Sequence, residues 1–172
     1  DVWTQRASAA NVSWKDIIWC SELDLFVAVG GPTLSAADQI MTSPDGITWT
    51  SRTAPSDRTW NGIAWSPTLT LFAAVANDGV DTGKVMTSPD GITWTARNAV
   101  GTRGWRRVVW ATTLNLFVAV SETIGFTDQV MTSPDGITWT LRDTGITSAW
   151  NDIAWSPSLS RLVAIGAPYL GG

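Results

Sequence analysis

The ten residues MTSPDGITWT stand at positions 41–50, and the same ten residues recur at 86–95 and 131–140. The three copies start 45 residues apart, and identity at such a fixed spacing shows an internal repeat. Within each copy, Ser-Pro-Asp-Gly is a tight-turn sequence between residues that favour strands. The stretch therefore predicts a hairpin that is built three times in one chain.

A second marker, Trp-x-x-[Ile/Val]-[Ile/Ala/Val]-Trp, extends the repeat. It begins at Trp14, Trp60, Trp105 and Trp150. A Leu-containing apolar segment such as LDLFVAV (23–29) follows each copy, and all 12 Trp of the chain fall on repeat positions. This regular spacing indicates that Trp packs a repeated structural unit.

Each unit predicts four short strands, named A to D in chain order. In the second unit we expect them at 60–66, 69–76, 84–88 and 91–97. Strands such as LFVAV are apolar on both faces, as expected for a sheet held between two neighbours. Four strands in about 45 residues is the period of a propeller blade, and the pattern excludes a helical solenoid. We therefore predict an all-β fold, a β-propeller of four-stranded antiparallel blades.

The blade count follows from the two ends of the chain. We expect one domain over 1–172, with units at about 14–52, 60–97, 105–142, and 150–172 plus 1–6. The fourth unit would take strands A and B from the C-terminus and strand D from VWTQR (2–6), closing the ring and removing exposed edges. The alternatives are a segment of a longer propeller, or two or more chains that combine into a larger ring.

The hairpin turn resembles the Asp-box, or BNR, repeat of sialidase-like propellers, although it lacks the residue between Asp and Gly. More generally, the chain resembles bacterial and phage repeat proteins with SPDG-x-TW units. The resemblance implies a structural turn away from any active centre. Its residues are Ser43, Asp45, Gly46, Ser88, Asp90, Gly91, Ser133, Asp135 and Gly136. Calcium at each turn would need more oxygen ligands than one Asp and one Ser supply.

Composition excludes several partners and cofactors. The chain has 11 basic and 15 acidic residues, a net charge of -4, no His and a single Cys, Cys20. We therefore expect no nucleic-acid partner, no disulfide within the chain, no metal and no cofactor. No apolar run reaches the roughly 20 residues of a membrane span, so membrane insertion is not expected. Asp1 stands where Met would begin a chain, so the sequence fits a processed or trimmed piece. The sequence leaves the location unknown, with an extracellular, cell-surface or virion location favoured.

Catalysis is not expected either. A sialidase-like site would imply an arginine triad, a Tyr nucleophile paired with a Glu, and an Asp acid. The single Tyr, Tyr169, lies in the C-terminal tail, and Arg6, Arg52, Arg97 and Arg142 are equivalent repeat positions. Without His, nucleophile systems of the Ser-His-Asp or Cys-His type are impossible. A carboxylate pair among Asp16, Glu122 and Asp152 remains possible by count, but near-identical units do not separate an acid from a base.

The units differ from one another mainly in their D-to-A loops, their B-to-C loops and the residues after the first Trp of strand A. In a propeller these parts share one face around the central channel, and loops on a rigid scaffold commonly bind ligands. We predict a non-catalytic binding module for a glycan or a protein surface there. The candidate residues are Trp14, Lys15, Asp16, Trp60, Asn61, Trp105, Arg106, Arg107, Trp150, Asn151 and Asp152.

Three alternatives to this hypothesis remain. The four Trp could serve inter-blade packing instead of offering aromatic platforms to a sugar. The chain could be a structural subunit that self-associates to complete its fourth blade. A glycosidase-like enzyme is the third alternative.

Overall fold

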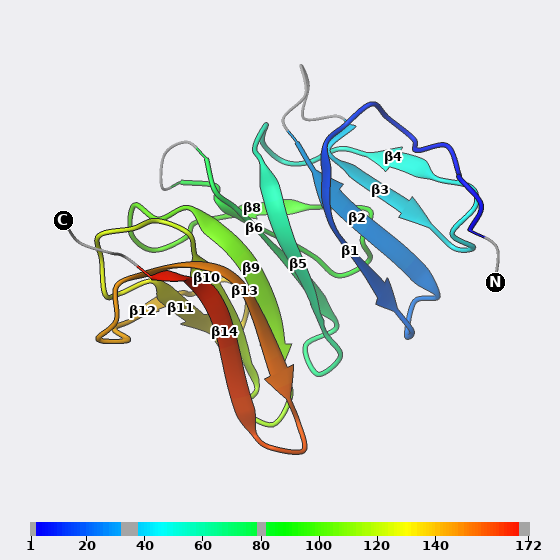
Figure 1. Ribbon diagram of the computed structural model, residues 1–172. Coiled ribbons are helices and arrows are strands. Elements are labelled where there is room, and N and C mark those ends of the chain that lie inside the picture. The colour runs from blue at the N-terminus through cyan, green and yellow to red at the C-terminus, as the bar shows by residue number, and fades with distance from the viewer. Residues whose placement is uncertain (1–2, 32–37, 79–81, 169–172) are drawn as a thin grey trace.

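The computed structural model describes residues 3–31, 38–78 and 82–168. Their regular structure consists of fourteen strands, all paired antiparallel, in three four-stranded sheets and one two-stranded sheet (Figure 1). The first sheet contains β1 (Trp14–Cys20), β2 (Leu25–Gly30), β3 (Ile40–Ser43) and β4 (Thr50–Arg52). The second contains β5 (Trp60–Ser66), β6 (Leu71–Ala76), β7 (Val85–Ser88) and β8 (Thr95–Arg97). The third contains β9 (Trp105–Ala111), β10 (Leu116–Ser121), β11 (Val130–Ser133) and β12 (Thr140–Arg142).

Each four-stranded sheet follows chain order, as a propeller blade does. The fourth unit is a hairpin of β13 (Ser148–Ser156) and β14 (Arg161–Pro168). The first strands of successive sheets, β1, β5, β9 and β13, run side by side (Figure 1). The prediction of an all-β fold of four-stranded antiparallel blades is confirmed.

The sheets stack through two kinds of face. The aromatic face of a sheet carries the Trp and Phe side chains of its first two strands, and the aliphatic face carries the small and branched side chains that alternate with them. At one junction, Ala73 and Val75 of the second sheet pack against Trp105 and Phe117 of the third. The other two junctions repeat this arrangement. The inner sheets have a neighbour on each side, which explains why their strands are apolar on both faces.

Strand D is shorter than predicted. We expected 91–97 in the second unit, whereas β8 covers only Thr95–Arg97. The carboxylate of Asp90 accepts the backbone N–H groups of Ile92 and Thr93, both at 2.8 Å, so these groups belong to the turn. The pairing of strand D with strand C therefore begins only after these turn residues.

The fourth unit also differs from the prediction. Residues 3–13 form no strand, and Trp3 is fully exposed, whereas Trp94 and Trp139 at equivalent positions are buried. In the complete sheets strand D pairs with strand C. No strand in the described ranges occupies the place of C beside β14, so residues 3–6 have no edge to join.

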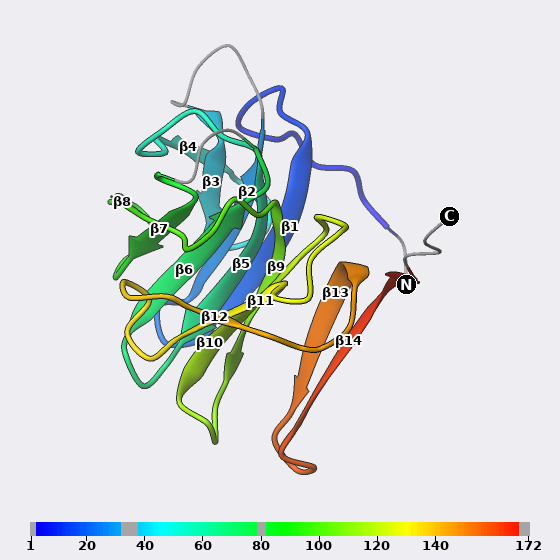
Figure 2. The same cartoon turned by 90° about the vertical axis from the view of Figure 1, so that its left-hand side faces the viewer.

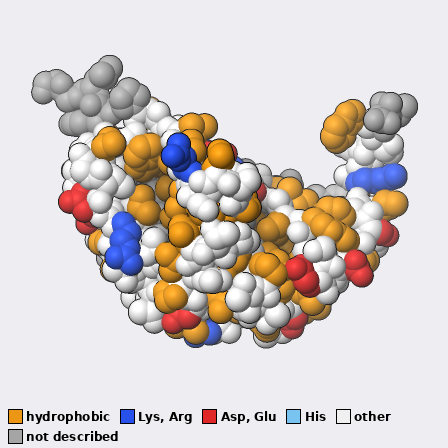
Figure 3. Space-filling model, turned by 90° about the horizontal axis from the view of Figure 1, so that it is seen from below, with side chains coloured by type: hydrophobic (Ala, Val, Ile, Leu, Met, Phe, Trp, Pro, Cys, Tyr) orange, Lys and Arg blue, Asp and Glu red, His pale blue; other side chains and the backbone are white. Residues whose placement is uncertain are grey.

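The stacked sheets form a crescent. Seen from the side, the four sheets follow one another, and their first strands, β1, β5, β9 and β13, lie toward the same side (Figure 2). Figure 3 shows the molecule hollowed between its two ends. The first strands, β1, β5, β9 and β13, therefore line the concave side, and the D-to-A and B-to-C loops lie at one edge of it.

Candidate binding face

The D-to-A and B-to-C loops interlock at one edge of the crescent. The backbone N–H of Arg58 donates to Gln39 Oε1 at 3.1 Å, and that of Thr59 donates to Asp78 Oδ2 at 2.7 Å. One D-to-A loop is thus fastened to the B-to-C loops of the sheets on both sides of it. We call this edge the loop face. Loop residues 32–37 and 79–81 lie outside the described residues.

Three buried polar side chains fasten these loops, and sequence reasoning missed all three. Gln39 Oε1 also accepts the indole N–H of Trp60 at 3.2 Å, and Gln129 Oε1 accepts the backbone N–H of Ser148 at 3.2 Å. At the equivalent position, Lys84 Nζ donates to the carbonyl of Arg103 at 2.9 Å. The sequence signal that could have identified them is a polar residue directly before strand C in each complete unit.

A β-bulge opens each first strand at the loop face. The residues after the first Trp have no partner across the ladder, which is a typical way to redirect side chains at a functional edge. They are Lys15, Asn61, Arg106 and Asn151. Candidate residues from four distant segments thereby come to lie at equivalent places on adjacent strands.

The residues that follow the bulges are also at equivalent positions, and one of them, Arg107, contacts two of the others. Its Nη1 lies 4.0 Å from Asp16 Oδ2, and its Nε lies 3.7 Å from Asp152 Oδ1. Its Nη1 also donates to the carbonyl oxygen of Asn61. The fourth equivalent position is Gly62, where an added Cβ would stand 2.9 Å from the Cα of Arg107. Gly62 thus allows β5 and β9 to approach closely beneath the arginine.

The carboxyl of Asp16 has an unusual environment. Burial raises its pKa above the ordinary value, and the charge of Asp152 adds to this effect. The backbone N–H of Ile63, which donates to Asp16 Oδ2 at 3.0 Å, and the charge of Arg107 act in the opposite direction without reversing it. A shifted pKa of this kind is common at binding and catalytic sites.

A second polar chain continues along the loop face. Arg106 Nη1 lies 2.8 Å from Glu122 Oε2, and the side-chain amide of Asn77 donates to Glu122 Oε1 at 2.7 Å. Strand β9 and the B-to-C loops of the second and third sheets therefore share one network. Glu122 was considered from the sequence only as a member of a carboxylate pair.

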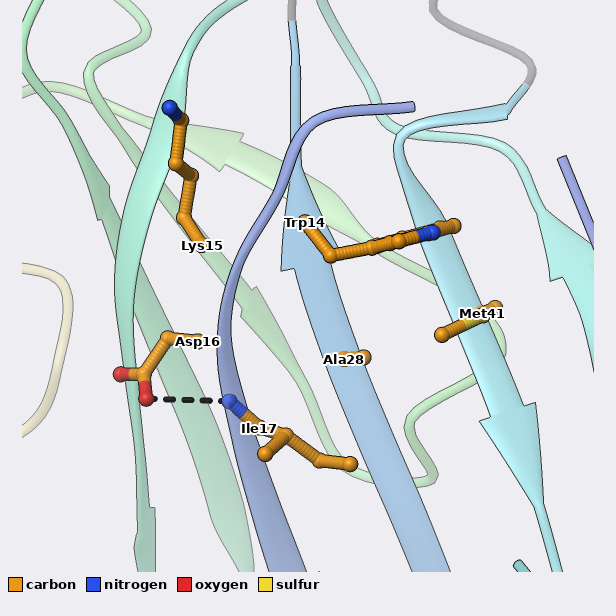
Figure 4. A pocket seen from close by; sticks show the side chains of 6 residues that line it. All are labelled: Trp14, Lys15, Asp16, Ile17, Ala28 and Met41. Atoms are coloured by element: carbon orange, nitrogen blue, oxygen red, sulfur yellow. Dashed lines mark hydrogen bonds between the residues drawn. The ribbon is translucent and has the colours of Figure 1, made fainter. Parts of the chain in front are cut away.

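The four first-strand Trp residues do not form a row of open platforms. Trp60 and Trp105 are 0% exposed and pack between sheets, so neither ring face is available to a ligand. Trp14 and Trp150 are half-buried. Trp14 lines an open hollow of about 320 Å³ on the first sheet, with its ring lying toward Met41 (Figure 4).

The repeated turns have the geometry of a structural device. The hydroxyl of Ser43 donates to Asp45 Oδ1 at 2.9 Å and accepts the N–H of Gly46, whose φ is 69°. The N–H groups of Thr48 and Ile47 and the Ser43 hydroxyl hold the pKa of Asp45 below its usual value. The other two turns repeat these contacts.

The remaining sequence candidates for chemistry are dispersed. Nε of Arg52, Arg97 and Arg142 each donates to a Thr hydroxyl of strand C at 2.9–3.1 Å, so these side chains brace separate sheets. Tyr169 lies outside the described residues. In the part of the chain that the structure describes, no group of three or more His, Cys, Asp or Glu side chains could hold a metal ion. No helix among the same residues is long and apolar enough to cross a membrane.

The stacked four-stranded sheets, with their first strands lining a concave side, define a protein of the β-propeller type. No protein-family model matches the chain, and no curated protein matches it. Among solved structures, the propeller protein in "YCF48 bound to D1 peptide" is similar, with a TM-score of 0.51 and 13% sequence identity. The match covers 86% of this chain and 45% of that chain. The chain therefore spans less than half the length of this neighbour, and the likeness shows the fold alone.

Proposed function

We propose that this chain is a non-catalytic binding module that recognises a protein surface or an extended peptide on its loop face. The main support is that Asp16, Gly62, Arg107 and Asp152 occupy equivalent positions on adjacent first strands and lie close together. The scaffold beneath them is nearly identical from unit to unit. Different side chains on a constant frame suit one asymmetric ligand better than several copies of a small one.

The burial of Trp60 and Trp105 favours a protein ligand over a glycan. Apolar sugar faces stack on exposed rings, and these two rings are enclosed between sheets. The accessible groups are mostly polar: Lys15 and Asn151 are exposed at the bulges, and the side chains of Arg107 and Asp152 are 28% and 58% exposed. Mixed charges of this kind give specificity and orientation to a protein partner.

The structural neighbour supports the same class of ligand. YCF48 is a propeller protein whose structure was solved with a peptide bound. Peptide binding is a property of that protein, and it supports a peptide as a ligand class for a scaffold of this type. We therefore take a peptide as the first probe for this chain.

A catalytic alternative has weaker support. The two carboxylates that come together, Asp16 and Asp152, have Arg107 between them. Such an ion-pair network differs from a glycosidase site, where an acid and a second carboxylate face the substrate across a gap. Self-association remains a separate proposal, because it concerns the ends of the stack and not the loop face.

The test is selection from a random peptide library displayed on phage, with the immobilised chain as bait, in parallel with a glycan array. We expect enriched peptides and no glycan signal. Lys15→Glu and Asp152→Lys should each weaken the binding of an enriched peptide about tenfold, the equivalent of about 1.4 kcal/mol.

The matched control is Thr113→Lys, which places a charge on an exposed hairpin at the opposite edge. It should leave peptide binding unchanged. A glycan signal without peptide enrichment would make the chain a lectin. Enriched peptides whose binding ignores the loop-face substitutions would place the site elsewhere.

A further inference from the structure

The two ends of the blade stack expose faces that are buried everywhere else in the molecule. At the first sheet the aromatic face is open: Ile17 is 53% exposed, whereas its equivalents Ile63, Val108 and Ile153 are 5%, 3% and 7% exposed. At the fourth unit the aliphatic face is open. Ile165 is 64% exposed there, against 0% for the equivalents Val29, Val75 and Val120.

These two open faces are the two halves of one junction. At each internal junction, the aliphatic face of one sheet packs against the aromatic face of the next. The fourth unit offers an aliphatic face with Val163 and Ile165, and the first sheet offers an aromatic face with Trp14, Ile17 and Trp19. The contact that would join them is already built three times within the chain.

The turn at Gly46 lacks a contact that the equivalent turns of the second and third sheets make with the sheet before them. In the second and third sheets, a Cβ added at Gly91 or Gly136 would meet Leu25 or Leu71 of the preceding sheet at about 3 Å. At Gly46, the described residues within 4 Å belong only to Phe26 of its own sheet. The side chain of a preceding sheet would fill this position.

Charge complementarity is present at that position. The residues equivalent to Leu25 and Leu71 in the third and fourth units are Leu116 and Arg161. A fourth unit seated on the first sheet of another copy would carry Arg161 to the turn that holds Asp45. An arginine there would meet an ionised carboxylate, since the hydrogen bonds of the turn lower the pKa of Asp45.

We propose that two copies of this chain associate head to tail, the aliphatic face of the fourth unit of each copy covering the aromatic face of the first sheet of the other. Two such junctions close a ring, whereas a rotation that failed to close would give filaments. This assembly is independent of the ligand proposed for the loop face.

The test is the solution mass of the intact chain by light scattering over a concentration series. Wild type should give twice the 18.5 kDa mass of one chain. Ile17→Lys and Ile165→Lys should each halve the observed mass. Both residues are exposed in the single chain, so the two variants should keep the far-ultraviolet circular dichroism spectrum of wild type. The matched control, Ile146→Lys, alters a D-to-A loop residue that is 58% exposed and should keep the two-copy mass.

Mixing separates head-to-tail contact from symmetric contact. An equimolar mixture of Ile17→Lys and Ile165→Lys retains one intact face of each kind, so the two-copy species should return. Arg161→Gln should weaken association and make it less dependent on salt, because it removes the attraction to Asp45 without adding a negative charge. A single-chain mass for wild type at every concentration, a mass that grows without limit, or a two-copy mass for either variant alone would overturn the proposal.

Discussion

The indole N–H of Trp65 donates to Glu22 Oε2 at 3.1 Å, which ties the second sheet to the first hairpin of the chain. The same relationship recurs between Trp155 and the hydroxyl of Thr112, also at 3.1 Å. At the intermediate junction the equivalent hairpin has Pro67, and Trp110 Nε1 has no hydrogen-bond partner among the described residues. Ring packing is therefore the constant contribution to the junctions, and the indole hydrogen bond is the variable one.

Replacing Trp65 by Ala should lower the free energy of unfolding by about 3–5 kcal/mol, because a large buried ring leaves a cavity. The measurement is urea denaturation followed by circular dichroism. Trp19→Ala is the matched control at the equivalent position of the open first sheet, where the ring is 43% exposed. In single-chain conditions its cost should be clearly smaller. A cost below about 1 kcal/mol for Trp65→Ala would contradict packing between sheets.

Gln39→Met should cost about 2–4 kcal/mol, because it leaves the backbone N–H of Arg58 and the indole N–H of Trp60 without their acceptor. Native-state hydrogen exchange should show faster exchange at Arg58 than in wild type. The control is Gln5→Met in the exposed N-terminal segment, which should change neither quantity. An unchanged exchange rate at Arg58 would show that Gln39 does not fasten the loop.

Asp90→Asn tests the turn through its pH dependence. Burial raises the pKa of Asp90, but the N–H groups of Thr93 and Ile92 and the hydroxyl of Ser88 outweigh it, so the net shift is downward. The resulting stabilisation is present above the unfolded pKa of about 3.9 and is lost as pH falls through the folded pKa. We expect the variant to be less stable by about 0.5–1 kcal/mol at neutral pH, after allowance for solvent screening, and equal to wild type in acid. A difference that is independent of pH would contradict this account.

Asp16→Asn should behave in the opposite way. The folded pKa of Asp16 is raised, so the associated stabilisation is complete below the unfolded pKa and is lost as pH rises through the folded pKa. The neutral amide oxygen can still accept the N–H of Ile63. We expect unchanged or higher stability at neutral pH, measured by urea denaturation. A loss above about 1 kcal/mol would mean that the ion pair with Arg107 outweighs burial.

The blade repeat was predictable because turn chemistry and Trp spacing are local in sequence. The loop face was predictable in outline, since strand order alone puts its loops on one edge. The pairing of Arg107 with Asp16 and Asp152 was not, because these residues lie on three separate strands and meet only when the sheets stack. Likewise, the burial of Trp60 and Trp105 depends on what the neighbouring sheet presents to each ring.

The use of one face pair at every junction affects how such a chain can change in evolution. A whole unit inserted or removed at a D-to-A loop would meet its neighbours through surfaces that already fit. Its stability would follow the number of units plus the junctions between them, as in linear repeat arrays. Duplication could then lengthen the crescent without a new core, while each added loop would be free to acquire its own specificity.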